Sequence, residues 1–150
     1  MNALQLYRDD GLLAPLLRAR DGTHRLGWLA PTLARVVEYG SLIALTLVSA
    51  PERMPFCFAF LAVLAFHHYD GAYRLQLQGS PPPAWVGLVG GGWEVRVAVA
   101  AVLALAGALG PALLVAAIAL GSIWVAESGL SWLRFARAGG APGFAGEELE

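Results

Sequence analysis

Charge is scarce in this sequence, and lysine is absent from it altogether. Only 14% of the 150 residues are charged, whereas soluble domains average about 25%. The length is that of one domain. The formal net charge is -1, so no basic field indicates nucleic acid as a partner. Arginine without lysine, together with much Ala, Gly and Pro, indicates a GC-rich bacterial genome.

Cysteine is almost missing as well. Cys57 is the one cysteine, which excludes a disulfide or a cysteine-based metal site within one chain. No basic segment leads into an apolar run at the start of the sequence, so we expect no cleavable signal peptide. Gly90-Gly91-Gly92 is not followed by Lys and Ser or Thr, so it is not a P-loop.

Hydrophobic residues are abundant instead. They make up 57% of the chain, and the mean hydropathy is +0.59. These values indicate an all-α polytopic membrane protein, and residues 28–135 are predicted to form a four-helix transmembrane bundle. The predicted spans are Trp28–Val48, Phe56–Tyr73, Val95–Leu109 and Ala112–Trp132.

The connections between these spans differ in length. Gly110-Pro111 is predicted to be a tight turn between spans three and four. The proline run after Gly79 ends span two, and we expect residues 84–89 to dip into the membrane interface. Residues 1–27 read as an amphipathic interfacial helix, with a frayed tail or a helix packed on another domain as open alternatives. Residues 136–150 are predicted to be a disordered tail.

The arginines set the expected orientation. They occur in residues 1–27, around the loop between spans two and three, and in the tail. The first short turn has only Arg53, beside Glu52, and the other short turn has no charge. The positive-inside rule therefore predicts a bacterial plasma membrane protein with both termini in the cytoplasm.

Polar residues interrupt every span near its cytoplasmic end. Ionisable groups at membrane depth usually line a site or pair with one another. The topology predicts one polar cavity open to the cytoplasm, and a network of ion pairs that locks the helices is the open alternative. The candidate residues are Arg35, Glu38, His67, His68, Asp70, Tyr73, Arg74, Glu94, Arg96 and Glu127.

The residue types suggest roles. Histidine ionises near neutral pH, so it suits a general base, and neighbouring helical positions diverge by about 100°, so we expect one of the two histidines to face the cavity. The catalytic candidates are His67, His68, Asp70 and Glu94. Guanidinium groups bind phosphate in pairs of hydrogen bonds, and the substrate-binding candidates are Arg35, Arg74, Arg96 and Tyr73. Carboxylates favour Mg²⁺ or Mn²⁺, and the metal-ligand candidates are Asp70, Glu38 and Glu127.

Two resemblances to known families add to this interpretation. His67-x-x-Asp70-Gly71-x-x-Arg74 resembles the first half of the CDP-alcohol phosphotransferase signature, Asp-x-x-Asp-Gly-x-x-Ala-Arg. His67 and Tyr73 depart from it, and of the four metal-binding aspartates only Asp70 is present, so that family's two-metal mechanism does not carry over. Most of residues 30–135 is more similar to an actinobacterial family of unknown function, which is found in proteins that also contain CDP-alcohol phosphotransferase and nucleotidyltransferase-like domains. That similarity rests on residues 67–74, 79–83 and 90–96.

The second resemblance implies a setting in phospholipid headgroup metabolism. We expect an integral membrane enzyme or enzyme domain that acts at the cytoplasmic interface on a phosphate- or pyrophosphate-bearing lipid or lipid precursor. A relation to the CDP-alcohol phosphotransferases would make it a transferase. The alternative is a non-catalytic, degenerate transferase-like bundle that serves as an anchor, a homodimer or a partner subunit of a CDP-alcohol phosphotransferase. A small transporter is a third alternative.

Overall fold

The computed structural model describes residues 30–139, and this part of the chain is helical with no strand. Its long helices are α3 (Ala30–Ser49), α4 (Met54–Leu77), α6 (Gly92–Leu105) and α7 (Leu109–Arg137). A short 3₁₀ helix, η2 (Pro51–Arg53), joins α3 to α4, and the seven-residue α5 (Ala84–Gly90) precedes α6. The predicted interfacial helix (1–27) and most of the tail (136–150) lie outside the described residues.

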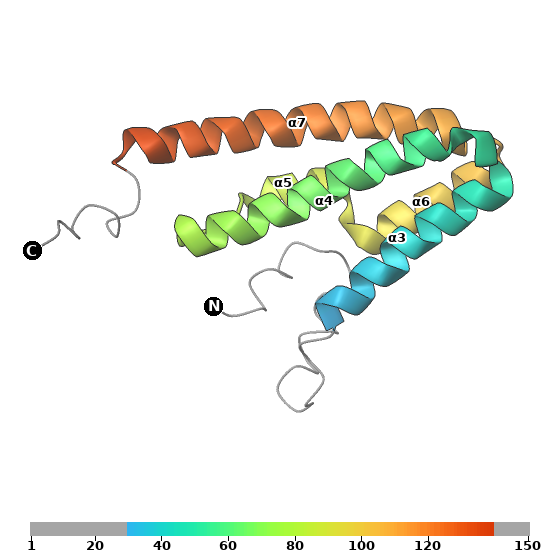
Figure 1. Cartoon of the computed structure of the whole chain (residues 1–150), viewed down its shortest axis with the longest axis horizontal. Coiled ribbons are helices and arrows are strands. Elements are labelled where there is room, and N and C mark those ends of the chain that lie inside the picture. Colours follow the sequence, from blue (N-terminus) through green and yellow to red (C-terminus); the bar gives the residue numbers. More distant parts are fainter. Residues whose placement is uncertain (1–29, 140–150) are drawn as a thin grey trace, which may run out of the picture.

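The helices pack as two pairs. α4 runs along α7, and α3 runs along α6. Figure 1 shows the α3–α4 connection and the α6–α7 connection at the same end of the bundle. The C-termini of α4 and α7 extend to the opposite end. One end of the bundle is therefore formed by the two short turns, and the other by the chain ends of the longest helices.

Small residues allow the α4–α7 pair to approach closely. A Cβ added at Gly121 of α7 would lie 3.1 Å from a methyl group of Val63 on α4. The core between the helices is apolar and includes Leu42, Phe60, Leu64 and Leu113, each less than 5% exposed. Such close contacts between small residues are typical of helices that associate in lipid.

Three segments are long and apolar enough to cross a membrane: Thr32–Ser49, Ala84–Leu105 and Leu109–Arg137. The first and last correspond to predicted spans one and four. Span three begins earlier than predicted, because α5 and α6 together form one apolar segment. α4, which corresponds to predicted span two, is not among these segments. At 24 residues it is long enough to cross a membrane, but its polar stretch from His67 to Asp70 lowers its mean hydropathy. The described residues thus support an all-helical membrane protein with three candidate spans.

The predicted turn at Gly110-Pro111 is wrong. Both residues lie in the first turn of α7, where proline is tolerated because its missing N–H would have no helical acceptor. The chain reverses before α7 begins, at Gly107, three residues before Gly110. The φ of Gly107 is +69°, a left-handed conformation that favours glycine. A second left-handed glycine, Gly91 at φ +72°, separates α5 from α6.

Candidate functional site

The first polar cluster joins α4 to α7. Arg74 donates from Nη1 to Glu127 Oε1 at 3.0 Å and from Nη2 to Glu127 Oε2 at 2.6 Å. Arg74 Nε lies 2.8 Å from Asp70 Oδ2, a contact with the distance of an ion pair but without hydrogen-bond geometry. The Arg74 side chain is 2% exposed. We call Asp70, Arg74 and Glu127 the α4–α7 cluster.

Asp70 has further partners on α7. Its Oδ1 accepts hydrogen bonds from Ser128 Oγ at 2.6 Å and from Trp132 Nε1 at 3.0 Å. Both donors lie on α7, and Arg74 on α4 contacts the other carboxylate oxygen. Asp70 therefore helps to hold α4 against α7.

The second polar cluster joins α3 to α6. Glu38 is fully buried, and its Oε1 accepts a 2.6 Å hydrogen bond from Arg96 Nε. Its Oε2 accepts a 2.8 Å bond from Arg35 Nη1 on the same helix. Arg96 also donates from Nη1 to the carbonyl oxygen of Gly90 at 2.9 Å. We call Arg35, Glu38 and Arg96 the α3–α6 cluster.

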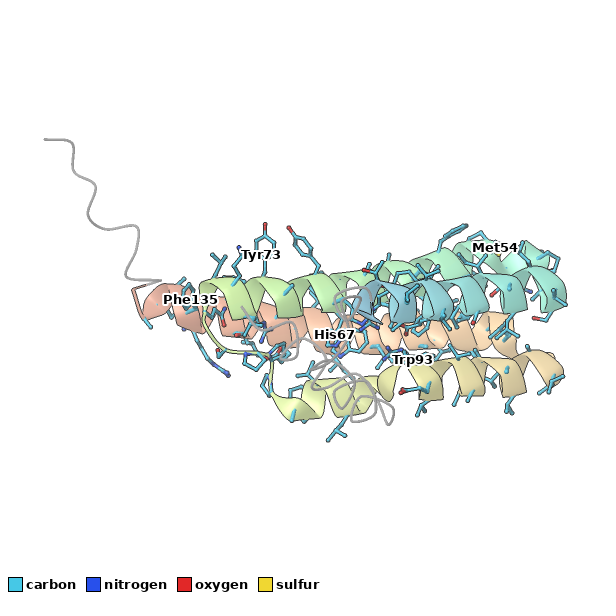
Figure 2. All side chains as sticks on the ribbon, turned by 90° about the horizontal axis from the view of Figure 1, so that it is seen from below. Met54, His67, Tyr73, Trp93 and Phe135 are labelled. Carbon is cyan, nitrogen blue, oxygen red and sulfur yellow. The ribbon has the colours of Figure 1, made fainter. Side chains whose placement is uncertain are left out.

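The two histidines lie between these clusters. His67 stacks on the indole of Trp124, with ring centroids 4.1 Å apart and planes 15° from parallel. His68 Nδ1 lies 3.3 Å from the hydroxyl of Tyr39, the residue next to Glu38. The expectation that only one histidine would face inward is wrong, because α4 crosses between α3 and α7 and each imidazole meets a different helix. Figure 2 shows His67 between the ribbons.

Trp124 connects the histidines to the α3–α6 cluster. Its Nε1 donates to the carbonyl oxygen of Val86 on α5 at 3.3 Å. A Cβ built on Gly90 would lie 2.8 Å from the Trp124 ring and 3.2 Å from Arg96 Nη1. The indole and the guanidinium therefore lie against the same glycine, which leaves no space for a side chain there.

Helix geometry gives the depth of each cluster. At about 1.5 Å per residue, Arg96 and Glu38 lie roughly 14 and 16 Å from the turn ends of α6 and α3. The same rise places Asp70 and Glu127 roughly 24 and 27 Å from the turn ends of α4 and α7. The two clusters therefore differ in depth by about 10 Å, whereas the sequence predicted one depth for all of these residues, and the α3–α6 cluster lies nearer the short turns.

Two predicted site residues lie apart from the clusters. Tyr73 is 41% exposed and its ring pairs with Tyr69 at 4.5 Å between centroids. It stands on the outer side of α4 (Figure 2), because it is one position away from the inward-facing Arg74. Glu94 lies in the first turn of α6 and is half-buried, and the ion pairs of the two clusters do not include it.

The predicted metal ligands are not gathered in one place. Glu38 belongs to the α3–α6 cluster, whereas Asp70 and Glu127 share Arg74. Within residues 30–139, no group of three or more His, Cys, Asp and Glu is arranged to hold a metal ion. The Mg²⁺ or Mn²⁺ ion stays a prediction, and the carboxylates of the two clusters are occupied by arginines.

Some site residues were not predicted. Trp124 and Trp132 place their indoles inside the site, although tryptophan near a helix end usually indicates an interfacial anchor. A helical-spacing signal was present, since Trp124, Ser128 and Trp132 recur every four residues and share one face of α7. Gln78 was also missed, and it accepts a hydrogen bond from Ser131 at 3.3 Å.

Most of the chain matches a known family model. Residues 10–148 match a family of unknown function, DUF5941. The chain belongs to this family. No curated protein and no solved structure matches it. Membership in DUF5941 is consistent with the predicted relation to a family of unknown function, and it names no reaction.

Proposed function

We propose that this DUF5941 chain is an integral membrane enzyme or enzyme domain that handles a phosphate- or pyrophosphate-bearing lipid or lipid precursor in the cytoplasmic half of the membrane. In this proposal α3, α4, α5–α6 and α7 cross the bilayer as four spans, and both termini lie in the cytoplasm. The single observation that supports it best is the gathering of buried charged groups from all four long helices in the interior of the bundle.

The cost of these charges supports a role beyond packing. Moving an ionised group out of water costs several kcal/mol even after relaxation, and apolar residues of similar volume often hold helices together as well or better. All six charged side chains of the two clusters have less than a quarter of their surface exposed: Arg35, Glu38, Asp70, Arg74, Arg96 and Glu127. Two half-buried imidazoles lie beside them. We assign this concentration of ionisable groups to a ligand.

The two clusters take different roles in the proposal. Arg74 makes two hydrogen bonds to Glu127 and an ion pair with Asp70, so the α4–α7 cluster positions the helices. The α3–α6 cluster has two guanidinium groups on one carboxylate, Glu38, and a phosphate is held there by Arg96 with Arg35. His67 or His68 is the base in a transfer reaction, and Glu94, at the same end of α6 as Arg96, is a second proton acceptor. A divalent ion would arrive with the pyrophosphate.

The test is calorimetric binding to the purified full chain in phosphatidylcholine nanodiscs. The ligands are a short-chain polyprenyl phosphate, the matching polyprenol and a CDP-alcohol, each with and without Mg²⁺. We expect the phosphate to bind at least tenfold more tightly than the alcohol, which is about 1.4 kcal/mol. Arg96→Gln should remove that preference, while Arg53→Gln, at the opposite end, should retain it. Equal binding of phosphate and alcohol by the wild type would refute the proposal.

A second candidate is the non-catalytic bundle that pairs with an active partner. The observation that favours it is the pairing of Arg74 with two carboxylates, Asp70 on its own helix and Glu127 on α7, which locks the two helices together. It predicts that Asp70→Asn destabilises the fold without changing any catalytic rate of the assembled membrane complex. The enzyme proposal predicts that His67→Ala and His68→Ala abolish that rate while the protein stays folded.

A further inference from the structure

An apolar cavity of about 240 Å³ lies between the two helix pairs. Its walls come from all of the described α-helices and include Leu42, Phe60, Val99, Ala100, Leu113 and Ala116. Arg96 is the only charged residue among those that line it. The cavity therefore has a hydrocarbon interior with a single cationic group, which is the complement of an amphiphile with an anionic head.

Arg96, which lines this cavity, has one donor that is not used within the described residues. Nε is bonded to Glu38 and Nη1 to Gly90, but Nη2 is buried and, among the residues that the structure describes, has no hydrogen-bond partner. The side chain is only 8% exposed. Leaving a buried donor without an acceptor is unfavourable, and more so for a charged group. An anionic oxygen on a ligand would satisfy this donor.

The dimensions fit one hydrocarbon chain. The lining of α6 runs from Val95 to Leu103, about 12 Å at the helical rise. The cavity volume is that of roughly eight water-sized groups at about 30 Å³ each. A methylene group is of similar size, so the cavity has room for roughly eight carbons of one chain. Val89 and Val99 line the cavity while being 44% and 51% exposed. The cavity is therefore open on one side, and the rest of a longer chain can leave through that opening.

We propose that this cavity binds a single-chain lipid anion, with its carboxylate or phosphate head on Arg96 Nη2 and its chain between α3, α6 and α7. This inference rests on the proposed function and names the part of the ligand that the proposed function leaves open. A diacyl lipid is a poor occupant, because two chains exceed the volume available.

The experiment separates chain from head. Binding of dodecyl phosphate, laurate, dodecanol and dodecyltrimethylammonium is measured on the full chain in phosphatidylcholine nanodiscs. We expect the two anions to bind at least tenfold more tightly than the alcohol and the cation. A preference for dodecyl phosphate over laurate identifies a lipid phosphate, and the reverse identifies a fatty acid. Equal binding of all four probes would overturn the inference.

Matched variants locate the site. Ala116→Leu fills the cavity from α7, and Ala119→Leu adds the same atoms to an exposed position of the same helix. We expect Ala116→Leu to raise the melting temperature and to weaken anion binding at least tenfold, and Ala119→Leu to bind like the wild type. Arg96→Gln should abolish the preference for anions. Wild-type binding by Ala116→Leu would place the chain elsewhere and overturn the inference.

The same panel distinguishes this inference from the proposed function. If polyprenyl phosphate binds with Arg96-dependent preference but Ala116→Leu has no effect, the inference is wrong and the proposed function stands. If laurate binds in the cavity but no lipid phosphate binds, the cavity inference holds with a fatty acid as ligand and the proposed function is wrong.

Discussion

Arg74 and Glu127 form a two-bond ion pair across the seam between α4 and α7, with nitrogen–oxygen distances of 3.0 and 2.6 Å. The two residues are far apart in the sequence, and their side chains are 2% and 15% exposed. At this burial the pair has little competition from water, and bidentate arginine–carboxylate contacts are among the strongest hydrogen bonds in proteins. The pair therefore fixes how α4 and α7 lie along each other.

Removing one partner of this pair should strongly destabilise the protein. Arg74→Ala is expected to lower the free energy of unfolding by about 3–5 kcal/mol, because it leaves two buried carboxylates without a cation. Glu127→Ala should cost less, because Arg74 keeps its ion pair with Asp70. The loss of stability in the double variant should be smaller than the sum of the two single losses. The difference is the coupling energy of the pair, about 1–3 kcal/mol. Reversible denaturation in detergent micelles measures all three variants.

The control is the exposed pair of Glu52 and Arg53, whose contact is 3.6 Å long and whose side chains are about half-exposed or more. Glu52→Gln should change stability by no more than about 0.5 kcal/mol. Additive losses in the Arg74 and Glu127 double variant would mean that the pair does not couple the two helices.

Gly90 is predicted to be intolerant of even one added methyl group. Gly90→Ala would bring a Cβ within 2.8 Å of the Trp124 ring, and overpacking of this kind costs about 1–3 kcal/mol. Gly129→Ala on α7 is the matched control, because a Cβ there meets nothing within 4 Å, and it should stabilise the helix by up to about 1 kcal/mol. Melting temperature and tryptophan fluorescence together check both effects. An unperturbed Gly90→Ala protein would show that Trp124 and Arg96 do not meet at this glycine.

The sequence predicted the fold class well but not the lengths of the elements. α3 and α7 were found because an apolar run as long as theirs is rarely anything but a membrane helix. The helical turn that contains Gly110 and Pro111 was missed, because those two residue types indicate turns more often than helix starts. The decisive feature was the left-handed conformation of Gly107, and a glycine's φ cannot be read from a chain with so many glycines.

The sequence indicated charged residues that do lie between the helices, but not their depth or their pairing. Glu38, Asp70, Arg96 and Glu127 were placed at one depth, whereas the α3–α6 cluster lies about 10 Å nearer the short turns than the α4–α7 cluster. Their division into two clusters was not predicted, because it depends on which helices are neighbours, and the pairing of α3 with α6 has no signal in hydropathy. Tyr73 was misplaced for a simpler reason, since adjacent helical residues point in different directions.

If the chain crosses the membrane four times, the two ends of the bundle lie on opposite sides of the membrane. In a background with Cys57→Ala, single cysteines are introduced as Glu52→Cys in the α3–α4 turn and Ser80→Cys after α4. A membrane-impermeant maleimide added to intact cells should label the first variant and label the second only after the cells are opened. Labelling of both in intact cells would show that α4 does not cross, which would leave the three spans that hydropathy alone supports.

The central claim is that an anionic lipid occupies the site beside Arg96, and native mass spectrometry of the protein extracted from its own membrane tests it most directly. We expect one retained lipid with a phosphate or carboxylate head on the wild type and on Arg53→Gln. That lipid should be lost from folded Arg96→Gln. A wild-type protein that carries no such lipid, or an Arg96→Gln protein that retains it equally, would contradict the claim.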